Sequence, residues 1–149
     1  MRNERRIYMS YVHWHKWIPI QGIPNETMYV DELTDGIGEE RLRIKLSNDA
    51  ESYFIEITFD APALYMYSDE GKRLRTLTKL EEEYGRDFYT KWTLVQVENS
   101  EILSWVYNES CLGEAKDVIV FKHYVIAGMD EFIDVISQYE PEVTMHRKE

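Results

Sequence analysis

The sequence ERLRIKL, at residues 40–46, alternates strictly between charged and apolar side chains. Neighbouring side chains of a β-strand point to opposite faces, so Leu42, Ile44 and Leu46 share one face and three basic side chains share the other. This pattern is typical of a strand with one buried face and one solvated face. We therefore predict a strand at 40–46.

A second run, at 52–59, alternates in the same way, and the polar residues 47–50 between the two runs suit a short turn. With a four-residue turn, Leu42 lies opposite Ile55 and the cross-strand apolar pairs fall on one face of the hairpin. A slip of one residue would send all of them to the other face. A third strand at 63–67 extends the predicted hairpin into an antiparallel meander.

The rest of the chain predicts both helices and strands. The expected elements are an extended segment at 11–18, a helix between Gly71 and Gly85, a strand at 92–97, a short helix capped by Asn99 or Ser100 that ends near Gly113, and a central strand at 117–127. Residues 130–139 fit a helix by spacing and a strand by their Ile and Val content, and the spacing favours the helix. The predicted fold class is α+β: one domain over residues 1–149, with a mainly antiparallel sheet, a meander in its first half and two or three short helices.

The composition predicts an acidic protein that folds on its own. The chain has 28 Asp and Glu against 17 Lys and Arg, a formal net charge of −11, and 44% hydrophobic residues among its 149. A chain of this size buries roughly 69% of its surface on folding. Such a charge repels nucleic acids and anionic membranes and attracts basic surfaces. We therefore expect a basic protein partner, no nucleic acid and no membrane.

The single cysteine and the N-terminal segment bear on location. Cys111 excludes an internal disulfide, and a lone thiol suits a reducing compartment. Arg2, Arg5 and Arg6 resemble the start of a signal peptide, but the segment that follows carries His and Lys where an apolar region is required. No apolar run reaches about 18 residues. We expect a cytoplasmic protein.

The sequence contains no motif for catalysis or cofactor binding. Gly36-Ile37-Gly38 lacks the third glycine of a dinucleotide fingerprint, and neither a Walker A sequence nor a G-x-S-x-G elbow occurs. His13 and His15 would point the same way on a strand, but a zinc site needs further ligands. We therefore expect no cofactor, no metal and no catalytic residue, and two half-buried histidines.

The candidate partner-binding residues are acidic. In the helix predicted after Gly71, the basic side chains crowd the N-terminal half and the acidic ones the last turn, which opposes the helix dipole by about 0.3–1 kcal/mol per charge. The same acids are simply a solvated face, or they dock a basic partner that relieves their repulsion. The candidates are Asp69, Glu70, Glu81, Glu82 and Glu83. The other close carboxylates, Asp130 and Asp134, are expected to be solvated.

Two functions of different classes follow. The first is a non-enzymatic acidic protein that binds a basic protein partner through acidic side chains and aromatic anchors, as an immunity protein or antitoxin does with its toxin. The alternative is a small-molecule-binding domain or enzyme whose pocket is lined by aromatic residues distant in sequence. No single-sequence motif would reveal such a pocket.

Overall fold

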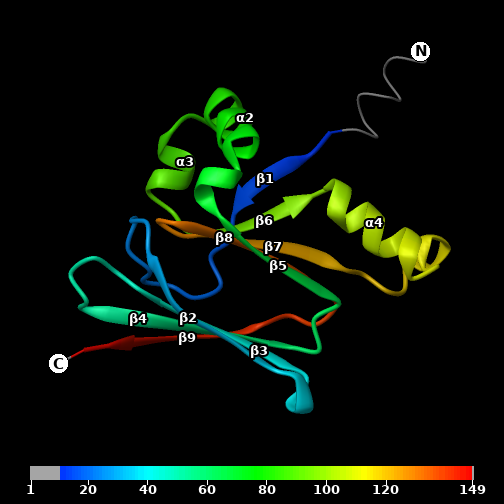
Figure 1. The fold of residues 1–149 in the computed structure, drawn as a ribbon, viewed down its shortest axis with the longest axis horizontal. Helices are drawn as coiled ribbons and strands as arrows, with labels where there is room; N and C mark the ends of the chain where they lie inside the picture. The colour runs from blue at the N-terminus through cyan, green and yellow to red at the C-terminus, as the bar shows by residue number, and fades with distance from the viewer. Residues whose placement is uncertain (1–10, 149) are drawn as a thin grey trace.

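The computed structural model describes residues 11–148, and in Figure 1 they form two stacked antiparallel sheets with helices above one of them. The lower sheet contains, in spatial order, β2 (Tyr29–Gly36), β3 (Arg41–Ser47), β4 (Tyr53–Asp60) and β9 (Glu142–Arg147). The upper sheet contains β1 (His13–Lys16), β6 (Leu94–Glu98), β7 (Lys122–Ala127), β8 (Glu131–Ser137) and β5 (Leu64–Asp69). The helices are α2 (Leu74–Tyr84), α3 (Asp87–Thr90) and α4 (Glu101–Glu109). The predicted α+β class with an antiparallel meander is confirmed, while Arg2, Arg5 and Arg6 lie outside the described residues.

The predicted hairpin is present as β3 and β4, but in a different register. Leu42 pairs with Phe59, not with Ile55, so the register is displaced by four residues. The reason is a longer loop. The Asn48 carbonyl Oδ1 accepts hydrogen bonds from the backbone N–H groups of Ser52 and Tyr53, at 2.9 and 3.3 Å, and closes the loop around itself. Because the displacement is an even number, the apolar side chains stay on the predicted face.

The main core lies between the two sheets. The inward side chains of β3 and β4 meet those of β6, β7 and β8, and each fully buried aliphatic side chain contributes about 1.5–3 kcal/mol. The buried set is Trp17, Met28, Leu42, Ile44, Leu46, Tyr53, Ile55, Ile57, Phe59, Leu94, Tyr124, Ile126, Ile133 and Val135. This core leaves the other face of the five-stranded sheet to be covered by the helices.

The region 117–127 forms the predicted central strand only in its second half. β7 begins at Lys122 and is the third of five strands, buried on both faces from His123 onward. The residues before it are an exposed turn, with Val118 84% exposed. The strand therefore begins at Lys122 and not at residue 117, where the β-branched residues before Lys122 had suggested its start.

Residues 130–139 form a strand, so the favoured helix was wrong. Within β8, Ile133 and Val135 face the core between the sheets, whereas Phe132 packs beneath the helices. A strand that is buried on both faces shows no alternation of polar and apolar residues, so the two-residue repeat that identifies a strand is absent from its sequence. The third predicted strand also differs from expectation: β5 leaves the meander and pairs with β8 in the other sheet.

The helices begin and end close to the predicted signals. Gly85 follows α2 with φ = 84°, a left-handed conformation that favours glycine, and Ser100 caps α4 by accepting a hydrogen bond from Leu103 N. α4 ends at Glu109, before the expected Gly113, because Cys111 adopts φ = 59°. The longest helix among residues 11–148, α2, has 11 residues, too few to cross a lipid bilayer.

Candidate functional site

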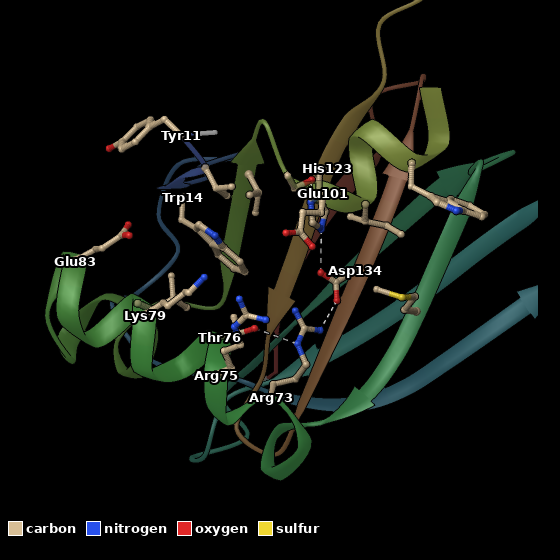
Figure 2. Close-up of a pocket in the computed structure, with 17 residues that line it drawn as sticks. Tyr11, Trp14, Arg73, Arg75, Thr76, Lys79, Glu83, Glu101, His123 and Asp134 are labelled. Carbon is tan, nitrogen blue, oxygen red and sulfur yellow. Dashed lines mark hydrogen bonds and ion pairs between the residues drawn. The ribbon is translucent and has the colours of Figure 1, made fainter. Parts of the chain in front are cut away.

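A buried polar network occupies the helix-covered face of the five-stranded sheet (Figure 2). Asp134 in β8 is 2% exposed, and its two carboxylate oxygens have different partners. Oδ1 lies 2.9 Å from His123 Nε2, and Oδ2 accepts a hydrogen bond of 2.6 Å from Arg73. The other ring nitrogen of His123, Nδ1, lies 2.7 Å from Ser100 Oγ. The network therefore joins β7 and β8 to the starts of both α2 and α4.

Arg73 is held in place by further contacts. Its guanidinium lies 5.1 Å from the centre of the Phe132 ring, a cation–π geometry, and donates a hydrogen bond of 3.2 Å to Ser68 Oγ. Arg73 precedes the first residue of α2, whose N-terminus has no side-chain cap. The ion pair with Asp134 thus fixes the start of a helix whose own charges oppose its dipole.

The surroundings of Asp134 favour its ionised form. Burial alone would raise the pKa of this carboxyl, but hydrogen bonds from His123 and Arg73 outweigh burial and hold its pKa below the ordinary value. No described side chain has a buried polar atom without a hydrogen-bond partner. The sequence-based expectation that Asp134 is solvated was therefore wrong.

Ser100, His123 and Asp134 form a chain of hydrogen bonds, but Ser100 faces Nδ1 and Asp134 faces Nε2 of His123, the reverse of a serine hydrolase triad, and the hydroxyl also caps a helix. Ser100 Oγ accepts the Leu103 N–H at 3.2 Å as the cap of α4, and the residue is only 6% exposed. We assign the three residues to the structural network and derive no catalytic step from them.

A pocket of about 700 Å³ opens above this network, between α2 and α4. Its lining comes from β1, α2, β6 and α4 together with His123 and Asp134. Three aromatic and three basic side chains are among the lining residues: Tyr11, Trp14 and Trp105, and Arg73, Arg75 and Lys79. The volume lies within the range of about 300–1,000 Å³ that is usual for small-molecule sites.

A second candidate site is an acidic surface at the end of β5 and the β7–β8 turn. Asp69 pairs with Glu131 in the sheet, and Glu70 N donates a hydrogen bond of 2.9 Å to Asp130 O. The exposed apolar side chains here are Tyr67, 58% exposed, and Met129, 40% exposed. We call this surface the acidic face and define it as Tyr67, Asp69, Glu70, Met129, Asp130 and Glu131.

The carboxylates of the acidic face repel one another. Partial burial, Asp130 and Asp69 together raise the pKa of Glu70, and partial burial and Asp130 raise that of Glu131. Within residues 11–148, no ion pair involves any of these four carboxylates. Four negative charges thus gather at one end of the sheet without a counter-charge from the described residues.

The predicted acidic candidates do not all fall on this face. Asp69 and Glu70 belong to it, whereas Glu81 lies near Tyr89, whose pKa is raised by burial, Glu81 and Glu70. Glu83 instead lines the pocket, and Glu82 is exposed on its own. Residues two apart on a helix differ by about 200° in direction, so a run of three glutamates cannot act as one patch.

The two N-terminal histidines are half-buried, as expected. Their rings stack at 5.6 Å, His13 Nδ1 lies 3.4 Å from the Tyr84 hydroxyl, and His15 Nε2 lies 3.7 Å from a Glu98 oxygen. No set of three or more His, Cys, Asp or Glu side chains in the described part of the chain is placed to hold a metal ion.

Comparison with protein-family models, with curated proteins and with solved structures finds no match to this chain. The two sites themselves are therefore the only guide to function.

Asp130, Glu131 and the residues of the polar network were not among the site residues predicted from the sequence. One signal was present: His123 lies in an apolar run predicted as buried, and a buried histidine needs hydrogen-bond partners. The sequence could not show which residues those partners are, because Arg73 and Asp134 are 61 positions apart.

Proposed function

We propose that this chain is a non-enzymatic binding protein that engages a basic protein partner through its acidic face, in the manner of an immunity protein or antitoxin. The observation that carries the proposal is the gathering of Asp69, Glu70, Asp130 and Glu131 around exposed Tyr67 without any ion pair to them in the described residues. Aromatic side chains surrounded by polar ones are typical anchors of protein interfaces.

The energetics of the acidic face favour a cationic partner. Carboxylates that raise one another's pKa are held together against their repulsion, and a lysine or arginine placed among them removes that repulsion on binding. The formal net charge of −11 adds long-range attraction, which speeds the encounter with a basic protein. The pairing would therefore be fast and sensitive to salt.

A matched pair of variants tests the proposal. The double variant Asp130→Asn with Glu131→Gln removes two charges from the acidic face, and Glu114→Gln with Asp117→Asn removes two charges from the exposed turn that follows α4. A basic partner is first isolated from native lysate with the wild-type chain, and its association rate is then measured by surface plasmon resonance at several salt concentrations. We expect the acidic-face variant to slow association about tenfold or more at low salt and the control to slow it far less, since steering is strongest near the binding site.

Two results would contradict the proposal. One is the recovery of no stoichiometric basic partner by the wild-type chain. The other is a partner whose association rate falls equally in both variants, which would locate the contact elsewhere on the surface.

A further inference from the structure

The pocket between α2 and α4 has a charge distribution unlike the rest of this acidic protein. Arg75 and Lys79 both come from α2 and both line the pocket, and neither forms an ion pair with any residue in 11–148. Arg73, the third basic residue of the lining, is by contrast committed to buried Asp134. Two cations therefore remain available to a ligand.

The placement of these two cations on α2 is electrostatically unfavourable. Residues four apart on a helix are neighbours, so Arg75 and Lys79 repel each other by about 0.2–0.5 kcal/mol. Arg75 also lies in the first turn of α2, where positive charge opposes the helix dipole. An anionic group between the two side chains would remove both penalties.

The two other carboxylates of the lining do not provide that group. Glu83 stands four residues after Lys79, in the last turn of α2, whereas Glu101 stands at the start of α4 across the pocket (Figure 2). Neither comes within ion-pair distance of Arg75 or Lys79, although Glu83 is one helical turn from Lys79. Because Glu83 and Glu101 stand on different elements at opposite sides, one cationic group cannot contact both, but one anionic group can bridge the adjacent Arg75 and Lys79.

The aromatic lining supplies the rest of the site. The indole of Trp14 reaches from β1 into the pocket on the side of α2, and Tyr11 and Trp105 also line it. Flat aromatic rings bury large areas against such side chains at little entropic cost. A pocket of about 700 Å³ has room for a molecule of two fused rings.

We propose that this pocket binds a small aromatic anion, with its carboxylate or phosphate between Arg75 and Lys79 and its ring against Trp14. The pocket is separate from the acidic face, since none of the residues that define that face lines it. The site therefore does not depend on the proposed protein partner, and a small acidic ligand, not a basic protein, is its occupant.

The test compares four probes: 2-naphthoate, the neutral 2-naphthalenemethanol, the cationic 2-naphthylmethylammonium and acetate. Dissociation constants are measured by NMR titration with the full chain at neutral pH. We expect 2-naphthoate to bind about tenfold or more tightly than the neutral and cationic analogues, since a charge-assisted hydrogen bond is lost in both. Acetate should bind more weakly than 2-naphthoate, because it lacks the ring.

Variants on the protein side use a matched control. Arg75→Gln should weaken 2-naphthoate binding about tenfold, whereas Arg86→Gln, which removes the same charge from an exposed position outside the pocket, should leave the dissociation constant within about twofold. Both arginines are exposed, so both variants are expected to fold, as thermal denaturation would verify. The proposal is overturned if no probe binds, if 2-naphthoate and 2-naphthalenemethanol bind equally, or if the two variants weaken binding equally.

Discussion

Asp134 and the acidic face hold carboxylates in opposite circumstances. Asp134 is almost fully buried, yet its pKa is lowered because His123 and Arg73 face it. Glu70 and Glu131 are only partly buried, yet their pKa values are raised because burial acts together with neighbouring carboxylates. The partners of a carboxyl, more than its depth, determine whether its charge stabilises the fold.

Asp134 therefore stabilises the folded state, whereas Glu70 and Glu131 destabilise it. Removal of Asp134 leaves a partly buried arginine and a buried histidine without their anion, whereas removal of Glu131 relieves repulsion. Groups that a fold retains against its own stability are often those that function requires. This contrast supports placing the partner surface at the acidic face and a structural role at Asp134.

The largest expected effect is that of Asp134→Ala. Removing one partner from a buried ion pair costs about 3–5 kcal/mol, because the remaining charge is buried without compensation. The control Asp60→Ala breaks the exposed pair with Arg41, which solvent screens, and should cost far less. Free energies of unfolding from urea denaturation would measure both, and equal costs would remove the distinction between the two kinds of carboxylate.

An intermediate effect is expected for Ser100→Ala. This variant removes the cap of α4 and the hydrogen-bond partner of His123 Nδ1, and the loss of a capping serine costs about 0.5–2 kcal/mol. Ser104→Ala, in the exposed middle of the same helix, serves as the control and should change stability by less than about 0.5 kcal/mol. Urea denaturation would again measure the difference, and equal values for the two variants would show that the network does not depend on Ser100.

The smallest effect, and one of opposite sign, is expected for Glu131→Gln. A carboxyl whose pKa is raised on folding destabilises the folded state at any pH above that raised pKa, so the variant should be more stable at pH 7, by up to about 0.5 kcal/mol. The gain should disappear as the pH falls through the raised pKa towards about 4.3, the value of an unfolded glutamate. Thermal denaturation between pH 4 and 7 measures this trend, with exposed Glu32→Gln as the control. A variant that is less stable at pH 7 would contradict it.

Two strands of the four-stranded sheet, β3 and β4, were predicted because that sheet has one solvated face, whereas β2 and β9 were not predicted. In β3 and β4 polar and apolar residues alternate in step with exposed and buried side chains. The face predicted to be buried is therefore the face that is buried in the structure. The register was not predictable, since the loop length depends on hydrogen bonds that the side chain of Asn48 makes after folding.

The five-stranded sheet was harder to predict because helices cover its second face. β8 has apolar side chains on both faces and Asp134 in its middle, so its sequence resembles an amphipathic helix as much as a strand. Only the tertiary partners His123 and Arg73 explain a carboxylate at that position. The buried strand β7 was recognised, since an apolar run of this length is typical of a central strand.

The two candidate sites also differ in how much of each could be predicted from the sequence. Asp69 and Glu70 were predicted because they are adjacent in the sequence, whereas Asp130 and Glu131 join them only through the pairing of β5 with β8. The pocket could not be predicted residue by residue, because its lining extends from Tyr11 to Asp134. The sequence indicated only that a pocket of this composition was possible, from the abundance of Tyr and Trp.

The position of β5 at the border of the five-stranded sheet has a consequence for self-association. Its outer side has no strand partner within residues 11–148, and such an edge can template the addition of another strand. β5 ends at Asp69, beside the other carboxylates of the acidic face, so two copies that paired these edges in parallel would bring their negative clusters together. This repulsion disfavours parallel edge-to-edge pairing of the chain with itself, and that protection weakens as the pH falls and these carboxylates take up protons.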